Sequence, residues 1–122
     1  MIDAVIDNNL PKSETVLLQL LKAGESPSGI LSMFARQMRL IVRAKDLKHQ
    51  KLSDTEIRSR LGINQEFLLR KTLEQASRYT ELRLKQVFQK MLDTDIAIKT
   101  GIYDPELAIN MLIAELCQAA VH

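Results

Sequence analysis

The residues best suited to metal binding or nucleophilic chemistry are few and widely separated. The soft metal ligands are His49, Cys117 and His122, which lie too far apart in the sequence to form a zinc motif. Asp93 and Asp95 would point to different faces of a helix, which disfavours a two-metal site. The sequence has no GxxxxGK[ST], GxGxxG, HExxH, EF-hand or GxSxG motif. We therefore expect no catalytic site, metal, cofactor or small-molecule substrate.

The single cysteine also informs on the cellular setting. One cysteine cannot form an internal disulfide, so we expect a reducing, cytoplasmic compartment. Cys117 is surrounded by apolar residues, and we interpret it as a small buried side chain rather than a nucleophile. The chain has no run of about 18 apolar residues, so neither a membrane span nor a membrane partner is expected.

Charged residues are distributed unevenly along the chain, although the net charge is only +2. Residues 36–90 hold 14 basic and six acidic residues, which is a net charge of +8. Residues 1–35 have a net charge of −2 and residues 91–122 a net charge of −4. A basic middle suits nucleic acid or an acidic protein partner, while ordinary solvated helix faces produce the same pattern.

Helices alone are expected to position these residues. A chain of 122 residues that is 46% hydrophobic and only 4% aromatic favours one helical domain over a sandwich or barrel. We predict an all-α fold, a single bundle of six to seven helices over residues 1–122. Periodicity and capping signals predict helices over residues 2–8, 12–23, 27–47, 54–61, 65–78, 80–100 and 105–121. The first of these begins abruptly, and we therefore expect the sequence to be a fragment of a longer protein.

Two of the predicted helices carry charged residues of interest. Arg36, Arg39 and Arg43 form a basic stripe opposite the main apolar face of the helix over 27–47, and they are candidates for contact with a partner or nucleic acid. Asp95 lies within the apolar face of the helix over 80–100. Because an unpaired buried carboxylate is costly, we expect Asp95 to be buried and paired with Lys99 or with an arginine of another helix.

The last predicted helix is apolar on almost every side. Such a helix is either the central rod of a bundle or a subunit contact. Ile109, Ile113, Leu116 and Val121 lie on different sides of it, so we expect some of them in the core and others at an interface with a partner subunit.

Residues 53–71 resemble a helix-turn-helix, in which two short helices flank Gly62 and the second carries Arg70 and Lys71. Arg58 occupies a position where that motif usually has a small residue, and the second helix is rich in leucine. A helix-turn-helix-like DNA-binding module therefore stands as the alternative function. Because dispersed lysine and arginine residues contact phosphates but do not read bases, we expect only weak, salt-sensitive binding to DNA.

A second resemblance covers nearly the whole chain, about residues 1–121. It rests on the order and spacing of Lys22–Pro27, Phe34–Arg39, Lys45–Leu47, Leu61–Ile63, Lys71, Gln75–Ala76 and Asp95–Gly101, followed by the apolar last helix. Together these segments resemble the C-terminal domain of the bacterial DNA polymerase III delta subunit.

The resemblance implies a role in DNA replication. Delta belongs to the clamp loader, which opens the sliding clamp and places it on primed DNA. The C-terminal helical domain is then the collar, a non-catalytic oligomerisation domain that holds the subunits in a ring. Its partners are other clamp-loader subunits, and its contact with DNA is weak or indirect. The resemblance also makes the two short helices around Gly62 a packing element.

Overall fold

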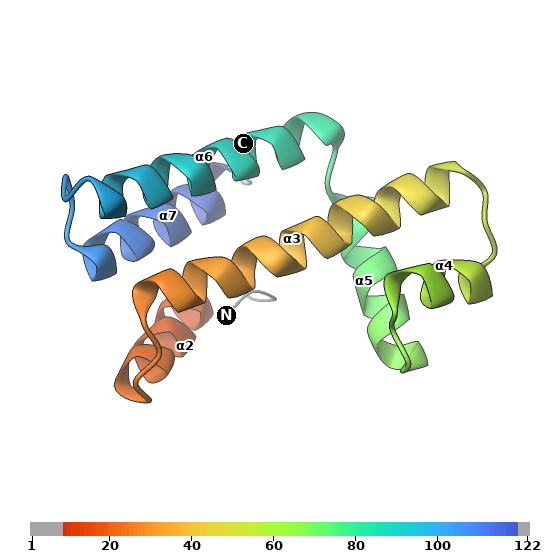
Figure 1. The fold of residues 1–122 in the computed structure, drawn as a ribbon, viewed down its shortest axis with the longest axis horizontal. Coiled ribbons are helices and arrows are strands. Elements are labelled where there is room, and N and C mark those ends of the chain that lie inside the picture. The colour runs from red at the N-terminus through yellow and green to blue at the C-terminus, as the bar shows by residue number, and fades with distance from the viewer. Residues whose placement is uncertain (1–8, 120–122) are drawn as a thin grey trace. The chain divides into compact units, whose positions relative to one another are not determined.

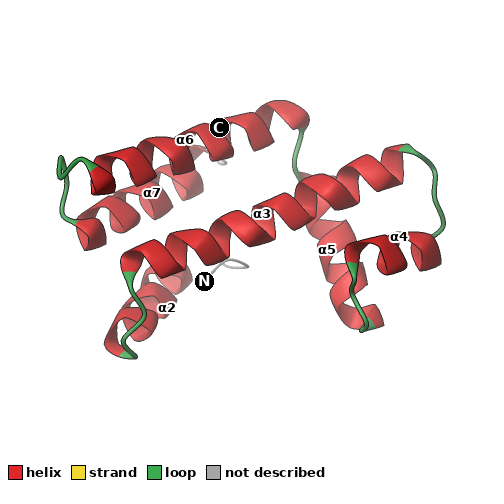
Figure 2. Ribbon diagram, viewed as in Figure 1, coloured by secondary structure: helices red, strands yellow, loops and turns green. Residues whose placement is uncertain are grey.

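The computed structural model describes residues 9–119, and this part of the chain consists of helices joined by loops (Figures 1 and 2). The helices are α2 (Leu10–Lys22), α3 (Pro27–His49), α4 (Asp54–Leu61), α5 (Glu66–Arg78), α6 (Glu81–Lys99) and α7 (Pro105–Ala119). No strand occurs among the described residues, and the all-α prediction is confirmed. The six corresponding predicted ranges agree with these bounds to within two residues. The helix predicted over 2–8 lies outside the described residues.

Capping signals explain where α4 begins and ends. The Ser53 hydroxyl oxygen accepts a hydrogen bond from the Glu56 backbone N–H at 3.2 Å, which satisfies one of the free donors at the helix N-terminus. Gly62 ends the helix in the left-handed conformation, with φ of 72°. The Ile63 N–H then donates to the Arg58 carbonyl at 3.1 Å, so a last-turn carbonyl is also satisfied.

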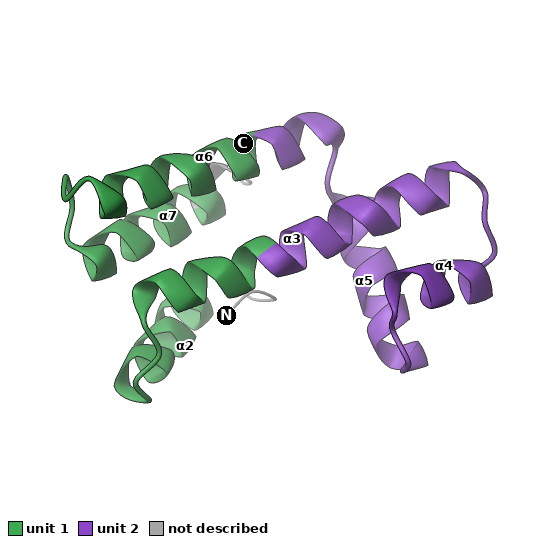
Figure 3. Cartoon of the chain, viewed as in Figure 1, with its two compact units in different colours: residues 1–35, 86–122 green, residues 36–85 purple. Residues whose placement is uncertain are grey.

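The chain divides into two compact units (Figure 3). Unit 1 comprises residues 1–35 and 86–122, and unit 2 comprises residues 36–85. The boundaries fall within α3 and α6, so each of these helices contributes one part to each unit. The expectation of one folded domain over the whole chain stays a prediction.

In unit 1, α2 packs against α7. Leu17 is the buried apolar residue of α2. Cys117 on α7 is buried, as expected for a small apolar side chain. Ser13 is fully buried too, and its hydroxyl donates to the Asn9 carbonyl at 2.7 Å, because a buried hydroxyl needs a partner. The first and last described helices are thus packed together.

Unit 2 has a small core of its own. Leu47 of α3, Ile57 of α4 and Leu69 of α5 are buried together. Partly buried side chains pack around them, namely Leu52, Leu61, Ile63 and Leu73. A polar contact adds to this core, because the Gln37 side-chain amide donates to Gln75 Oε1 at 3.2 Å and joins α3 to α5. Three helix segments therefore hold each other in place around one apolar cluster.

Candidate interaction surfaces

Most of the positive charge belongs to unit 2. Residues 36–85 include 13 basic and six acidic residues, a net charge of +7, whereas the rest of the chain has a net charge of −5. The uneven distribution seen along the sequence therefore corresponds to two compact units of opposite charge. Unit 2 is the part of the protein that attracts anions.

The predicted arginine stripe lies on the exposed surface of α3. Arg36, Arg39 and Arg43 are all exposed. Arg43 Nη2 donates to the Arg60 carbonyl at 2.9 Å, in the last turn of α4. Because the last carbonyls of a helix have no partner within it, this bond holds the end of α4 against α3. Arg43 thus has a structural contact, and binding by the stripe stays a prediction.

The surface of α5 offers few free cations to a DNA groove. Arg70 is exposed, whereas Lys71 is half-buried and interacts with another residue of the chain. Arg78 Nη2 pairs with Glu74 Oε1 at 2.7 Å, and Phe67 near the start of the helix is exposed. With Arg78 paired to Glu74 and Lys71 half-buried, α5 presents few cations for the bidentate contacts to guanine that are the commonest form of base reading.

The structure pairs Asp95 with Lys99 but does not bury it. Lys99 Nζ lies 2.8 Å from Asp95 Oδ2, while the Asp95 side chain is 37% exposed and that of Lys99 72% exposed. The expected burial of Asp95 was wrong. Met91 is the last buried residue of α6, and the two turns that follow are only partly covered, so the apolar face ends before Asp95.

Replacing Asp95 with alanine should lower the free energy of unfolding by at most about 1 kcal/mol. An exposed ion pair between residues four apart on a helix contributes little, because solvent screens both charges. Urea denaturation of the parent, Asp95→Ala, Lys99→Ala and the double variant isolates the pair energy. A loss of about 3 kcal/mol or more for Asp95→Ala would show that the carboxylate has a buried role.

The candidate interface residues of α7 lie in the core. Ile109, Ile113 and Leu116 are each 2% exposed, so these three belong to the core and not to an exposed interface. Val121 lies outside the described residues. The physical reason is that α7 is covered by the chain itself. It packs against α2, and Lys90 Nζ on α6 binds Glu115 Oε2 on α7 at 3.1 Å.

Exposed apolar side chains occur elsewhere in unit 1. Leu92 and Ile96 are 51% and 47% exposed, and their spacing of four residues places them on the same face of α6. Three more follow in the next loop and the first turn of α7, namely Ile102, Tyr103 and Leu107. These residues were not predicted as an exposed surface. The available signal was that Leu92 and Ile96 are apolar but lie off the main apolar face of the helix predicted over 80–100.

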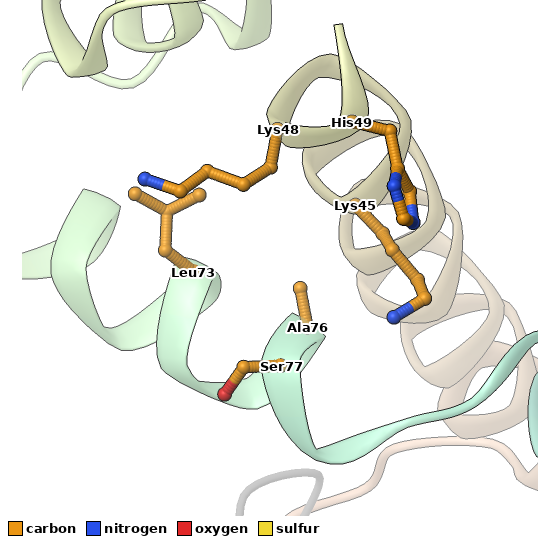
Figure 4. Close-up of a pocket in the computed structure, with 6 residues that line it drawn as sticks. All are labelled: Lys45, Lys48, His49, Leu73, Ala76 and Ser77. Carbon is orange, nitrogen blue, oxygen red and sulfur yellow. The ribbon is translucent and has the colours of Figure 1, made fainter. Parts of the chain in front are cut away.

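A pocket that was not predicted from the sequence lies in unit 2, between α3 and α5 (Figure 4). The cavity has a volume of about 190 Å³. It is lined by Lys45, Lys48, His49, Leu73, Ala76 and Ser77. Each helix contributes residues at positions i, i+3 and i+4, which share one helix face. That spacing was the available signal, but it does not say that the two faces meet.

In the part of the chain that the structure describes, no group of three or more His, Cys, Asp or Glu residues is placed to hold a metal ion. No helix of residues 9–119 is both long enough and apolar enough to cross a membrane.

The fold and its surfaces define an all-α domain with one basic and one acidic unit. Residues 1–116 match the family described as "DNA polymerase III delta subunit, C-terminal domain". The chain belongs to this family, and the resemblance noted from its motifs is confirmed.

Individual relatives agree with this assignment. The chain is similar to DNA polymerase III subunit delta of Bacillus subtilis (strain 168), with 25% identity over 116 residues that cover 95% of this chain and 33% of that protein. Among solved structures it is similar to the Bacillus subtilis DNA clamp loader delta protein. The TM-score is 0.83 and the identity 25%, and the match covers 96% of this chain and 34% of that one. The chain thus spans about a third of the length of the relatives it matches.

Proposed function

We propose that this domain is the non-catalytic collar of a clamp-loader delta subunit, through which delta assembles with the other clamp-loader subunits. The family match over residues 1–116 supports the proposal, as does the similarity to a DNA clamp loader delta protein. In this role the domain supports loading of the sliding clamp during DNA replication. The proposal assigns it no catalytic step, cofactor or small-molecule substrate.

The observation that carries the assembly role is the exposed apolar face of α6. Leu92 and Ile96 are each about half exposed, one helical turn apart. Contiguous exposed apolar surface is typical of protein interaction sites, and aliphatic side chains at the centre of an interface stabilise it by leaving water. We assign the subunit contact to this face, because the apolar side chains described on α7 after Leu107 are largely buried.

Glutamate at position 92 or 96 should block assembly while leaving the helical fold intact. Because each site is exposed in the isolated chain, a carboxylate there is solvated, whereas in an assembled ring it would be buried without a partner. We expect the affinity for the other clamp-loader subunits to fall by more than about tenfold, which corresponds to about 1.4 kcal/mol. Size-exclusion chromatography with light scattering measures complex formation, and circular dichroism measures helicity.

Gln86→Glu is the matched control, because Gln86 is exposed on the same helix but lies on a different face. It should assemble as the parent does. Normal assembly of both Leu92→Glu and Ile96→Glu would contradict an α6 interface. Failure of the parent chain to bind any clamp-loader subunit would contradict the collar role itself.

A DNA-binding module is the second candidate, and the net charge of +7 on unit 2 is the observation that favours it. The α4–Gly62–α5 segment has the order of elements of a helix-turn-helix. Against base reading stands the small number of cations that α5 presents, because Arg78 pairs with Glu74 and Lys71 is half-buried. We infer contact with phosphates only.

Binding to duplex DNA is therefore expected to be weak, insensitive to sequence and strongly reduced by salt. Lysine and arginine that neutralise phosphates release counterions, so the logarithm of the binding constant falls linearly with the logarithm of salt concentration. Fluorescence anisotropy with random duplexes between about 50 and 200 mM salt measures the slope. A selection that enriched one motif bound about 10³-fold above random duplex would instead establish the DNA-binding module.

A further inference from the structure

We propose that the pocket between α3 and α5 of unit 2 binds an acidic peptide segment of a partner protein, with one apolar side chain of that segment inserted into the cavity. Figure 4 shows the two sides of the site. The Lys48 side chain extends from α3 toward Leu73 of α5, the side chains of Lys45 and His49 lie along α3, and Ala76 and Ser77 complete the lining on α5. The site thus combines a basic rim on one helix with an aliphatic floor on the other.

The cations of the rim are only partly explained by the fold. Lys48 and His49 lie in the last turn of α3, where the helix dipole stabilises positive charge. Lys48 Nζ also pairs with Asp54 Oδ1 at 3.4 Å, but both side chains are more than 60% exposed, and such a pair is easily exchanged for another.

Lys45 lies a turn earlier and has no such explanation. It is half-buried, and among the described residues it makes neither a hydrogen bond nor an ion pair. The methylene stem of a half-buried lysine can lie against apolar surface while its ammonium group stays at the rim in water, available to a partner. A carboxylate supplied by a ligand would be that partner.

The cavity indicates what else the ligand must contain. Leu73 and Ala76 supply aliphatic surface, and a volume of about 190 Å³ is large enough for one apolar side chain, since a cavity of about 150 Å³ accommodates benzene. Single-stranded nucleic acid is bound mainly by stacking of its bases on aromatic rings. Among the six described residues that line the pocket, His49 supplies one aromatic ring, an imidazole, and none supplies a phenyl, phenol or indole ring, so the surface for base stacking is small. The site therefore fits a peptide better than a nucleotide.

Charge complementarity determines the sign of the net charge that the peptide must carry. The rim carries Lys45 and Lys48, and the whole unit has a net charge of +7. An acidic segment is drawn to this unit by the long-range field and is then held by the pocket. A basic segment would be repelled at both stages.

The test uses the full 122-residue chain and fluorescence anisotropy. The probe is a labelled octapeptide with three glutamates on each side of a central Leu-Leu pair. Two further peptides are matched to it, one with Ala-Ala at the centre and one with lysines in place of the glutamates. We expect the leucine peptide to bind at least about tenfold more tightly than the alanine peptide, and the lysine peptide not to bind.

Variants locate the binding. Lys45→Glu and Lys45→Gln should each weaken binding of the leucine peptide, the former by at least about tenfold. Lys85→Glu is the control, because Lys85 is exposed in the same unit and is not among the residues lining the pocket. This control should change the affinity for the leucine peptide by less than about threefold, because it alters only the overall charge of the unit, which salt screens. Ser77→Leu, which narrows the exposed rim, should weaken the leucine peptide more than the alanine peptide.

Two results would overturn the proposal. Equal weakening by Lys45→Glu and Lys85→Glu would mean that only the net charge of the unit attracts the peptide. Tight binding of oligothymidylate that displaces the peptide would mean that the site belongs to nucleic acid. The pocket lies in unit 2 and the α6 residues Leu92 and Ile96 lie in unit 1, so this test and the collar test fail independently.

Discussion

Replacing Ile113 with glutamate is expected to unfold unit 1 at temperatures where the parent protein is folded. The side chain is 2% exposed, in the middle of α7. An unpaired carboxylate there must either be buried at a cost of several kcal/mol or force the helix out of the core. A cost of that size is comparable to the total stability of a small domain, about 5–15 kcal/mol. Thermal melts followed by circular dichroism should show loss of the cooperative transition.

Leu107→Glu is the matched control, since Leu107 lies in the first turn of the same helix and is 50% exposed. The substitution adds the same charge at a solvent-exposed site, and the helix dipole stabilises a carboxylate near the helix N-terminus. Its melting temperature should stay within a few degrees of the parent value. If Ile113→Glu melted like Leu107→Glu, the burial of α7 described above would be wrong.

Ile57→Ala is expected to lower the free energy of unfolding of unit 2 by about 2–5 kcal/mol. Ile57 is fully buried, and it is the one residue of α4 in the apolar cluster with Leu47 and Leu69. Truncation removes apolar contact and leaves a cavity, and α4 is too short to be stable without packing. Urea denaturation measures the loss, and hydrogen exchange should locate the faster opening in α4.

Leu61→Ala serves as the comparison, because Leu61 is on the same helix but only partly buried against that cluster. Its effect should be clearly smaller. A loss below about 1 kcal/mol for Ile57→Ala would show that α4 is held mainly by polar contacts, such as the bond from Arg43 to the Arg60 carbonyl, rather than by the apolar cluster.

Local signals account for how well the helices were predicted. Ser53 and Gly62 bound α4 through a side-chain cap and a left-handed turn, and both effects involve residues close in sequence. Asn64, just before α5, is of a residue type that often caps helices. The structure instead has Gln65 at the N-cap without a side-chain hydrogen bond, so a polar residue near a helix start need not be its cap.

The predictions that failed are those that depend on contacts between residues distant in the sequence. Periodicity identifies the faces of α7 but not which of them are covered, and Ile113 was consequently left as a candidate for both core and interface. Asp95 lies on the expected face of α6, but where the covering ends depends on other helices. The pocket requires Lys45 and Ala76 to meet across 31 positions of chain, which no local pattern predicts.

The division of the chain into units has a consequence for the order of folding. Unit 2 is one continuous stretch of 50 residues, whereas unit 1 is assembled from two stretches separated by it, with α2 packed on α7. Contacts between residues distant in sequence form slowly, because loop closure costs entropy before the contacts repay it. Unit 2 therefore has the lower contact order. If unit 2 folds first, residues 36–85 are already compact, which shortens the loop that must close when the two stretches of unit 1 come together. During synthesis, unit 1 is complete only when α7 leaves the ribosome.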